Sequence, residues 1–352
     1  MDDAGKNVDV VLESGIIVDT ISNFCVHLPT KCKMMSADSG RLLRAIHVVN
    51  LDFICPVGKD EEMQFDDTGS GCGWHGEFAF VTVVHFGILQ NLSEIAILHT
   101  NDTHSTVMPL NRNLNDTMKA GRGGYLRRIA MLKEERKANP DLLLFDSGDF
   151  SQGSPYYTMY EGDVEVGLMN IMKYDAVAIG NHEFDFGLDN MARLFRKAEF
   201  PIVCANYDFS GTAVEGLVKP YVVLKRSGLR IGVFGLSPKL SGLVSEKNYP
   251  GVMYIDPRIA APRVAAMLKG KEKCDVVICL SHLGWDLKPD MDDSTMIAAS
   301  RDIDLVLGGH SHSYFTDLEW VRDAAGHNVP VDQNGKHGIF IGRITMSIES
   351  KR

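Results

Sequence analysis

Five short polar segments carry the residue types that bind divalent metal ions, and most of them place glycine beside the candidate ligand. They are NDTH (residues 101–104), SGD (147–149), GNHEFD (180–185), SH (281–282) and GGHSH (308–312). Imidazole, carboxylate and amide oxygen suit borderline ions such as Zn²⁺, Mn²⁺, Fe²⁺ or Co²⁺, and no thiolate is in the set. The segments therefore predict a metal site built from His, Asp and Asn.

Each segment alone is ambiguous, because Gly-Asp is a common turn and a lone His beyond a strand is usually a packed rim residue. The joint arrangement is more informative, since each segment directly follows a short apolar run that is typical of a buried strand. In α/β sheets, the loops after the carboxyl ends of the strands gather at one edge. We therefore expect all five segments to meet at one rim.

A site of this composition fits two metal ions. One carboxylate must bridge if two ions are to lie about 3.5–4 Å apart, and such a pair clamps a phosphate and lowers the pKa of a bridging water. Glycine beside the ligands lets the backbone approach the ions closely. The chemistry predicted is hydrolysis of a phosphate ester.

Short runs rich in Val, Ile and Leu alternate with amphipathic segments from residue 93 onward, and these elements must position the polar loops. Continuous apolar runs bounded by turn residues predict strands buried on both faces, hence an α/β layered fold. Residues 221–225 and 229–234, joined around Ser227 and Gly228, predict a hairpin. The predicted strands cover residues 95–99, 142–145, 176–179, 202–205, 221–224, 231–234, 276–280, 303–307 and 339–344.

Helices are predicted over residues 124–137, 164–173, 188–198, 257–268 and 294–301. In the first of them, Leu126, Ile129 and Leu132 recur at three-residue spacing, as expected for the apolar face of an amphipathic helix. The preceding GRGGYLRR (121–128) lacks the Gly-Lys-Ser/Thr ending of a nucleotide-binding P-loop, so we interpret it as the start of this helix. Arg122 in this loop is a candidate contact for an anionic substrate.

Composition limits the classes of protein to which the chain can belong. Hydrophobic types make up 45% of the 352 residues and charged types 23%, which excludes a wholly disordered chain, a collagen-like repeat and a coiled coil. The net charge of −10 argues against binding a nucleic acid polymer through bulk charge. The cysteines form no tight pair, which favours neither a disulfide framework nor a zinc ribbon. No apolar run is long enough to predict a transmembrane helix.

Residues 1–92 differ in composition from the rest and are expected to form an extension of unknown role. They contain the glycine-rich stretch TGSGCGWHG (68–76), which is typical of a flexible connection. Three interpretations stay open: a poorly ordered extension, a small β-rich appendage, or translated sequence upstream of the true start. We interpret the run FAFVTVVHFGIL (78–89) as a buried strand, because it lies too far inside the chain for a signal peptide and follows acidic residues.

The motifs LHTNDTHS, DSGDF, GNHEFD, SHLG and GGHSH occur in this order within residues 93–352. On these motifs the chain resembles the calcineurin-like metallophosphoesterases, and within them the 5'-nucleotidase/UDP-sugar hydrolase group. The resemblance implies a two-sheet sandwich flanked by helices, with a dimetal site at the carboxyl ends of the strands. Residues 93–352 are then the catalytic domain.

Carried over residue by residue, the resemblance implies two overlapping sets of metal ligands that share Asp149 as the bridge. One set is Asp102, His104, Asp149 and His312, and the other is Asp149, Asn181, His282 and His310. Relatives place Gln, Asn or His at the position of His312. The resemblance also assigns His182 and Asp185 as the catalytic pair and implies that Asn181 contacts the substrate.

The chemistry of the pair supports this assignment independently. His182 adjoins the predicted ligand Asn181 but points differently from it, so it can face the leaving-group oxygen. Asp185, three residues on, can fix the tautomer of His182 and raise its basicity. An imidazolium at this place stabilises developing charge and protonates the leaving alkoxide. The alternative is that His182 is a structural histidine beside the metal ligands.

Two-domain members of this group continue into a C-terminal domain that carries the nucleoside-binding aromatic and arginine side chains. The chain stops at Arg352, so we expect that domain to be missing, and a separate chain that carries it is a candidate partner. Tyr156 and Tyr157 are interpreted as the packed start of the helical region around Val164, which leaves no obvious pair of stacking aromatics in residues 93–352. Relatives are mostly exported, which predicts an extracytoplasmic or periplasmic location, although the acidic start is not a recognisable signal peptide.

The leading hypothesis is a metal-dependent phosphoester hydrolase that acts on nucleotides. A cyclic-nucleotide phosphodiesterase or a sugar-nucleotide pyrophosphatase on the same centre is the closest alternative. An alternative from another class is a non-catalytic metal-binding subunit that presents this rim to a partner. The intact pair of His182 and Asp185 argues against it, because a binding module has no need of a general acid.

Overall fold

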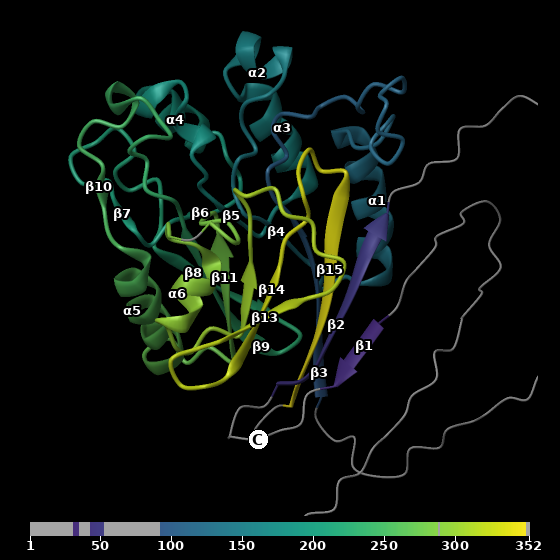
Figure 1. Cartoon of the computed structure of the whole chain (residues 1–352), viewed down its shortest axis with the longest axis vertical. Helices are drawn as coiled ribbons and strands as arrows, with labels where there is room; N and C mark the ends of the chain where they lie inside the picture. The colour runs from purple at the N-terminus through teal and green to yellow at the C-terminus, as the bar shows by residue number, and fades with distance from the viewer. Residues whose placement is uncertain (1–30, 35–42, 53–91, 288, 350–352) are drawn as a thin grey trace, which may run out of the picture.

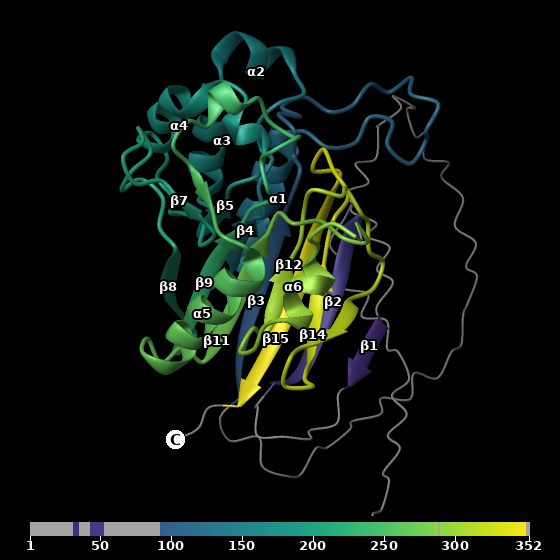
Figure 2. The same ribbon diagram turned by 60° about the vertical axis from the view of Figure 1, so that its left-hand side comes forward.

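The computed structural model describes residues 31–34, 43–52, 92–287 and 289–349. Two β-sheets pack face to face, and helices cover their outer faces (Figures 1 and 2). The strand predicted at residues 78–89 lies outside the described residues.

The first sheet has seven strands and combines distant parts of the chain. Their order is β1 (Lys31–Met34), β2 (Leu43–Asp52), β15 (Phe340–Glu349), β3 (Leu92–Thr100), β4 (Leu143–Asp146), β5 (Ala176–Ala178) and β6 (Ile202–Val203). Strand β15 pairs antiparallel with both β2 and β3, so part of the segment before residue 93 contributes backbone to this sheet.

The second sheet has six strands. Their order is β13 (Glu319–Arg322), β14 (Asn328–Asp332), β12 (Leu305–Leu307), β11 (Val276–Ser281), β9 (Leu229–Leu236) and β8 (Tyr221–Arg226). A separate two-stranded sheet joins β7 (Tyr207–Asp208) to β10 (Met253–Tyr254).

Parallel pairing directs the functional loops to one end of the sandwich. Strands β3 to β6 are parallel in the first sheet, and β9, β11, β12 and β14 are parallel in the second. Their carboxyl ends lie toward the upper end of the molecule in Figure 1. The loops that follow them therefore share one rim, as expected from the sequence.

Helices form the two outer layers. The first sheet is covered by α1 (Tyr125–Ala138), α3 (Asp163–Met172) and α4 (Gly187–Phe195), and the second by α5 (Pro257–Gly270) and α6 (Asp293–Ala298). The short helix α2 (Pro155–Tyr160) projects above α3 at the rim. Two 3₁₀ turns complete the set, η1 (His182–Phe184) and η2 (Glu246–Asn248). In the described part of the chain, no helix combines the length and the apolar character that crossing a bilayer requires.

Both faces of the central strands are buried, which explains their continuous apolar runs. In β4, Leu143 and Phe145 pack between the sheets, whereas Leu144 packs against the helices of the first sheet. In β11, Ile278 packs between the sheets and Val277 against α5 and α6. Because successive side chains of a strand point to opposite faces, only a strand with two covered faces tolerates apolar residues at every position.

All the strands and helices predicted from residue 93 onward are present, with small shifts of their ends. The hairpin is confirmed, because β8 pairs antiparallel with β9 around Ser227 and Gly228. Of the three residues predicted for the apolar face of α1, Leu132 is buried and Ile129 packs partly buried against the core, but the prediction for Leu126 was wrong. Leu126 is 73% exposed, and Tyr125 is buried in its place with its hydroxyl 3.3 Å from that of Thr103.

Close approach of the two sheets leads to a prediction at Gly235 of β9. A Cβ atom there would lie 2.1 Å from the carbonyl oxygen of Val203, so Gly235→Ala should lower the free energy of unfolding by about 1–3 kcal/mol through overpacking. Gly167 in α3 is a matched control, because its Cβ would meet no atom within 4 Å. Gly167→Ala should raise stability by about 0.5–1 kcal/mol. Urea unfolding measures both, and equal effects would contradict the prediction.

Candidate metal centre

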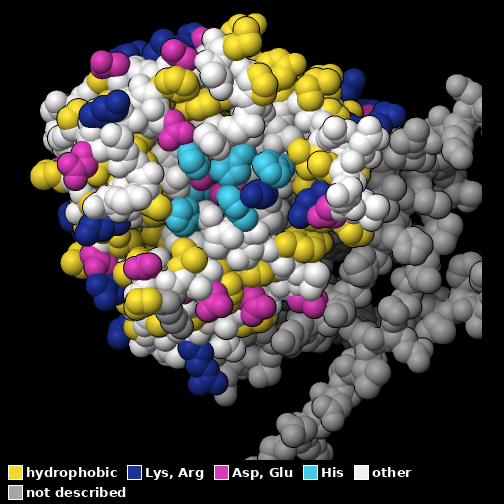
Figure 3. Space-filling model, turned by 45° about the horizontal axis from the view of Figure 1, so that its top comes forward, with side chains coloured by type: hydrophobic (Ala, Val, Ile, Leu, Met, Phe, Trp, Pro, Cys, Tyr) yellow, Lys and Arg dark blue, Asp and Glu magenta, His cyan; other side chains and the backbone are white. Residues whose placement is uncertain are grey.

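The structure brings the predicted ligands from both sheets to one rim, where histidine side chains gather on the surface (Figure 3). Three groups have ligand atoms that all lie within 4.8 Å of one another. The groups are Asp102, His104 and His312; His104, Asp149 and His182; and Asp149, His282 and His310. His104 and Asp149 each belong to two groups, so the three form one continuous cluster.

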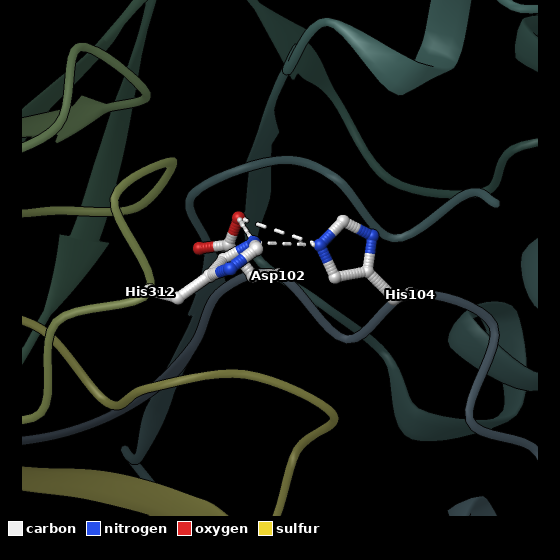
Figure 4. A group of neighbouring side chains, drawn as sticks. All are labelled: Asp102, His104 and His312. Atoms are coloured by element: carbon white, nitrogen blue, oxygen red, sulfur yellow. Dashed lines mark hydrogen bonds and ion pairs between the residues drawn. The ribbon is translucent and has the colours of Figure 1, made fainter. Parts of the chain in front are cut away.

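The first group combines a loop of the first sheet with a loop of the second (Figure 4). Nε2 of His312 lies 3.4 Å from Oδ1 of Asp102, and Nε2 of His104 lies 3.8 Å from the same oxygen. The two Nε2 atoms are 2.9 Å apart. A carboxylate oxygen and two imidazole nitrogens thus converge on one point.

The third group is buried deeper. Nε2 of His282 lies 3.0 Å from Oδ2 of Asp149. Nδ1 of His282 donates to the carbonyl oxygen of Ser147 at 2.7 Å. Burial opposes protonation of His282, but the charges of Asp149 and Asp102 outweigh it and raise its pKa to about 10. Burial, together with the neighbouring His282, lowers the pKa of His310 to about 4. The neutral imidazole of His310 is therefore a suitable metal ligand.

An unpartnered buried atom tests whether an ion fits. Within the described residues, Oδ1 of Asn181 is buried and has no hydrogen-bond partner. Such a group destabilises the folded protein by about 1–3 kcal/mol unless something binds it. A divalent ion satisfies this oxygen, so the residues present fit the metal that the sequence predicts.

The backbone of the cluster is held in an uncommon conformation. The φ angles are positive at Asp102 (48°), His104 (42°), Asp149 (55°), His310 (72°) and His312 (56°). Left-handed conformations are rare outside glycine and persist only where the surrounding structure enforces them. The ligand geometry is therefore imposed by the fold.

Glycine beside the ligands has a steric reason. A Cβ atom on Gly180 would lie 2.1 Å from Oδ1 of Asp149, and one on Gly309 would lie 3.1 Å from Oδ2 of Asp102. Any side chain at Gly180 would therefore displace the carboxylate that the two groups share.

Glu183 holds two of the loops together, a role that the sequence did not predict. Its carboxylate accepts backbone N–H groups from Asp149 (3.0 Å), Ser151 (3.1 Å) and Gly180 (2.7 Å). Burial raises its pKa to about 7, and the charge of Asp149 adds to the rise. The loops after β4 and β5 are thus fixed relative to each other by one side chain.

A second set of contacts orients Asp102. Its Oδ2 accepts from Nδ2 of Asn101 at 2.7 Å and from the backbone N–H of His310 at 2.9 Å. Oδ1 is the oxygen left to face the imidazoles of the first group. Asn101 is held in turn by the carbonyl oxygen of Gly335 (2.8 Å) and by the N–H of Asn334 (3.0 Å).

Removing the hydrogen bond from Asn101 to Asp102 should weaken metal binding. Asn101→Ala removes one of the two groups that orient the Asp102 carboxylate, and we expect a 10- to 100-fold lower metal affinity, the usual effect of losing a residue that orients a ligand. Asn170→Ala is the control, because this amide also links two backbone groups, those of Lys197 and Glu199, but lies on α3. Competition with a chromogenic chelator measures the affinity. Unchanged affinity in Asn101→Ala would show that Asp102 is oriented by other contacts.

The predicted catalytic pair lies at the edge of the cluster. Nδ1 of His182 is 3.0 Å from Oδ2 of Asp185, and the side chains are 30% and 32% exposed. Burial opposes protonation of His182, but the hydrogen bond with Asp185 and the charge of Asp149 outweigh it, so its pKa is raised. The imidazole is therefore both protonated more readily than usual and accessible to a substrate.

The structure also shows where the two tyrosines and the arginine singled out in the sequence lie. Tyr156 and Tyr157 belong to the separate helix α2, which ends at Glu161 in a left-handed conformation. Tyr157 is buried, whereas Tyr156 is 37% exposed. Among the described residues, the buried Nη1 of Arg122 has no hydrogen-bond partner.

Comparison with known proteins identifies the family. The model of the calcineurin-like phosphoesterase family matches residues 95–314, which is more than half of the chain. The chain belongs to the calcineurin-like phosphoesterase family. The family and the two-sheet sandwich predicted from the sequence are thereby confirmed.

The relatives of this calcineurin-like phosphoesterase include nucleotidases. It is 32% identical to human 5'-nucleotidase over 278 residues, which cover 73% of this chain and 47% of that protein. The crystal structure of a 5'-nucleotidase precursor from Thermus thermophilus matches with a TM-score of 0.65 and 29% identity, covering 72% of this chain and 51% of that one. A calcineurin-like phosphoesterase from Bacillus subtilis matches with a TM-score of 0.61 and 26% identity, covering 74% and 86%. The chain spans about half the length of the curated nucleotidases it matches.

The family match does not include every residue that shapes the centre. All predicted ligands and the pair of His182 and Asp185 lie within residues 95–314. Asn334 and Gly335, which hold Asn101 and through it Asp102, lie beyond the match. This calcineurin-like phosphoesterase therefore positions one ligand from a segment outside the shared region.

Proposed function

We propose that the chain is a metal-dependent phosphoester hydrolase that acts on nucleotides. The observation that carries the proposal is the position of Asp149, which shares one ligand group with His104 and His182 and another with His282 and His310. A carboxylate in this place suits a bridge between two divalent ions. The similarity to human 5'-nucleotidase supports a nucleotide as the substrate.

Seven residues hold the two ions in this proposal. The first ion takes Asp102, His104, Asp149 and His312, and the second takes Asp149, Asn181, His282 and His310. The mixture of imidazole, carboxylate and amide oxygen suits Zn²⁺, Mn²⁺, Co²⁺ or Fe²⁺. When bound, the ions bind phosphate oxygens and lower the pKa of a water molecule that attacks phosphorus.

His182 is the general acid in this mechanism. Asp185 accepts the proton of Nδ1, which directs Nε2 and its proton away from Asp185. The raised pKa of His182 increases the fraction that carries both protons near neutral pH. Nε2 donates its proton to the ester oxygen as the bond to phosphorus breaks, so the nucleoside leaves as a neutral alcohol.

A substrate panel tests the proposal. The purified chain, loaded in turn with Mn²⁺, Zn²⁺, Co²⁺ and Mg²⁺, is assayed on AMP, cyclic AMP, UDP-glucose and p-nitrophenyl phosphate. We expect hydrolysis of AMP and of the aryl ester, and its loss on chelation. Cleavage of only the cyclic or only the sugar nucleotide would select one of those alternatives. A metal-loaded chain inactive on the whole panel would be a binding subunit.

Discrimination between bases should be weak. The metal ions and His182 recognise the phosphoryl group and the ester oxygen, which all nucleoside monophosphates share. We expect kcat/KM for AMP, GMP, CMP and UMP to agree within about tenfold, equivalent to about 1.4 kcal/mol of transition-state binding. Steady-state kinetics measures the four values. A preference above about a hundredfold would show a base-specific pocket within the chain.

A further inference from the structure

The chain at and just after the end of β14 contacts two of the loops that carry predicted metal ligands, one from each sheet. We call residues 332–337 the bridging segment, and it lies beyond the region that the family model matches. The first loop, residues 101–104, follows β3 and carries Asp102 and His104. The second, residues 308–312, follows β12 and carries His310 and His312. The bridging segment thus joins ligands that the two sheets supply separately.

On one side, the bridging segment holds the loop of the first sheet. The backbone N–H of Asn334 donates to Oδ1 of Asn101 at 3.0 Å. The backbone N–H of His337 donates to the carbonyl oxygen of Asp102 at 2.7 Å. The backbone of the ligand Asp102 is therefore fixed directly, in addition to the contacts that orient its carboxylate.

On the other side, backbone hydrogen bonds hold the loop of the second sheet. The N–H of Gly308 donates to the carbonyl oxygen of Asp332 at 2.8 Å, and the N–H of Phe315 donates to that of Gln333 at 3.0 Å. Gly308 precedes the two histidine ligands of this loop, and Phe315 follows them. Both ends of the loop are thus fixed to the bridging segment.

One side-chain contact lies between the two histidine ligands. Oε1 of Gln333 accepts from the hydroxyl of Ser311 at 2.9 Å, and the hydroxyl oxygen accepts from the backbone N–H of Trp285 at 3.0 Å. Ser311 is flanked by His310 and His312, whose φ angles are both positive. A rotation of the backbone at Ser311 would turn the two imidazoles relative to each other. The contact with Gln333 therefore fixes the directions of both.

The stability of the fold does not explain why Gln333 is buried. Its side chain is 1% exposed, and among the described residues its only hydrogen bond is the one to Ser311, because the buried Nε2 has no partner. A buried amide with an unsatisfied N–H lowers stability, whereas an apolar side chain of similar shape avoids that cost. What Gln333 supplies is an acceptor oxygen for Ser311.

We propose that Gln333 is a positioning residue of the metal centre, which acts through Ser311 on the two histidines beside it. Together with the contacts to the loop of the first sheet, it sets the separation of 3.4 Å between Oδ1 of Asp102 and Nε2 of His312. The first ion takes both of these residues in the proposed function, on which this inference rests. Loss of the contact changes the geometry of the ligands without removing any of them.

Gln333→Met tests the positioning role, because it keeps a long unbranched side chain and removes the oxygen that Ser311 contacts. The affinity for Co²⁺, measured by competition with a chelator, should fall about 10- to 100-fold, the range typical of residues that orient a ligand. The visible absorption bands of bound Co²⁺ report the coordination geometry and should shift in position. The urea midpoint of the metal-free chain should stay nearly unchanged, because an apolar side chain replaces a partly unsatisfied amide.

Gly235→Ala is the converse control. A Cβ atom at Gly235 would meet Val203 rather than a ligand loop, so this variant should lower the urea midpoint and leave the affinity for Co²⁺ and its bands unchanged.

A double-mutant cycle tests the route through Ser311. Ser311→Ala should lower the affinity for Co²⁺ to a similar extent as Gln333→Met, and the double variant should lose no more than the larger single loss. Two losses that add in full would contradict an action of Gln333 through Ser311.

The measurements separate this inference from the proposed function, because Co²⁺ binding needs no substrate. A lower affinity and shifted bands in Gln333→Met support the positioning role even if no ester in the panel is hydrolysed. If AMP is hydrolysed and Gln333→Met binds Co²⁺ with unchanged affinity and bands, the inference is overturned and the proposed function stands. A loss of affinity with unshifted bands and a lowered urea midpoint would also overturn it, since general destabilisation gives that result.

Discussion

Replacement of Asp149 by Asn should remove metal from both ion positions. Asp149 lies in two ligand groups, with Oδ2 3.0 Å from Nε2 of His282 and Oδ1 2.9 Å from the backbone N of His182. A neutral amide cannot supply the charge that a bridging carboxylate gives to two ions. Activity should fall by about 10³-fold or more, since several kcal/mol of transition-state stabilisation depends on the ions.

Asp102→Asn is the matched comparison. Asp102 is also buried, and its replacement by Asn exchanges a carboxylate for an amide in the same way. Asp102 belongs to one ligand group only. Elemental analysis after dialysis should find two ions per chain in the unaltered protein, close to one in Asp102→Asn and close to none in Asp149→Asn. A single ion per chain at saturation, unaffected by Asp149→Asn, would disprove the bridge.

His182→Ala should keep the metal and lose turnover. A positioned general acid contributes about 10²–10⁴-fold, or roughly 3–5 kcal/mol of barrier. Asp185→Asn should act in the same direction through the tautomer and orientation of His182, because their 3.0 Å contact is the hydrogen bond that fixes Nδ1. Single-turnover kinetics with nucleotide and metal analysis on the same samples measure both effects.

The His182→Ala variant also decides whether His182 acts as a general acid or as a metal ligand. His182 lies within one ligand group with His104 and Asp149, so a ligand role predicts metal loss. If His182→Ala loses metal while turnover per bound ion stays nearly constant, the residue is a ligand or a structural histidine. A leaving group that needs no proton, such as p-nitrophenolate, gives a second check, because its hydrolysis should depend less on His182.

The fold could be predicted where both faces of a strand are buried. Runs such as those of β4 and β11 are apolar throughout because helices and the opposite sheet cover them. Strands β13 and β14 were missed, since β13 lies at the edge of its sheet and contains charged residues, and β14 contains a proline, Pro330. In α1, spacing predicted the burial of Leu132 but not that of Tyr125, whose contact with Thr103 places it in the core in place of Leu126.

The ligand loops could be predicted because each places polar side chains at the end of an apolar run, most of them beside a glycine. The residues that support them could not. His99 lies 2.8 Å from Asp332, and Asn101 bonds to Asn334, but each pair is separated by 233 positions in the chain. A single polar residue gives no sign of such a partner, so these contacts follow only from the folded structure.

A cavity beside Asp185 was also invisible in the sequence. It is formed by turns and by glycines such as Gly187, Gly211 and Gly251, which leave space rather than fill it. Absent side chains produce no periodicity and no motif. Phe186 lines this cavity and follows the catalytic pair directly, yet nothing in its type distinguishes it from a core residue.

Strand β15 lies between β2 and β3, although it comes from the far end of the described chain. On the ribosome, β3 emerges with its ligand loop long before residues 340–349 exist to pair with it. The histidines after β11 and β12 are also translated late, so the nascent chain holds Asp102 and Asp149 without their partners. Contacts between such distant segments form slowly. The first sheet, and with it the full set of candidate ligands, therefore assembles only after residues 340–349 have been synthesised.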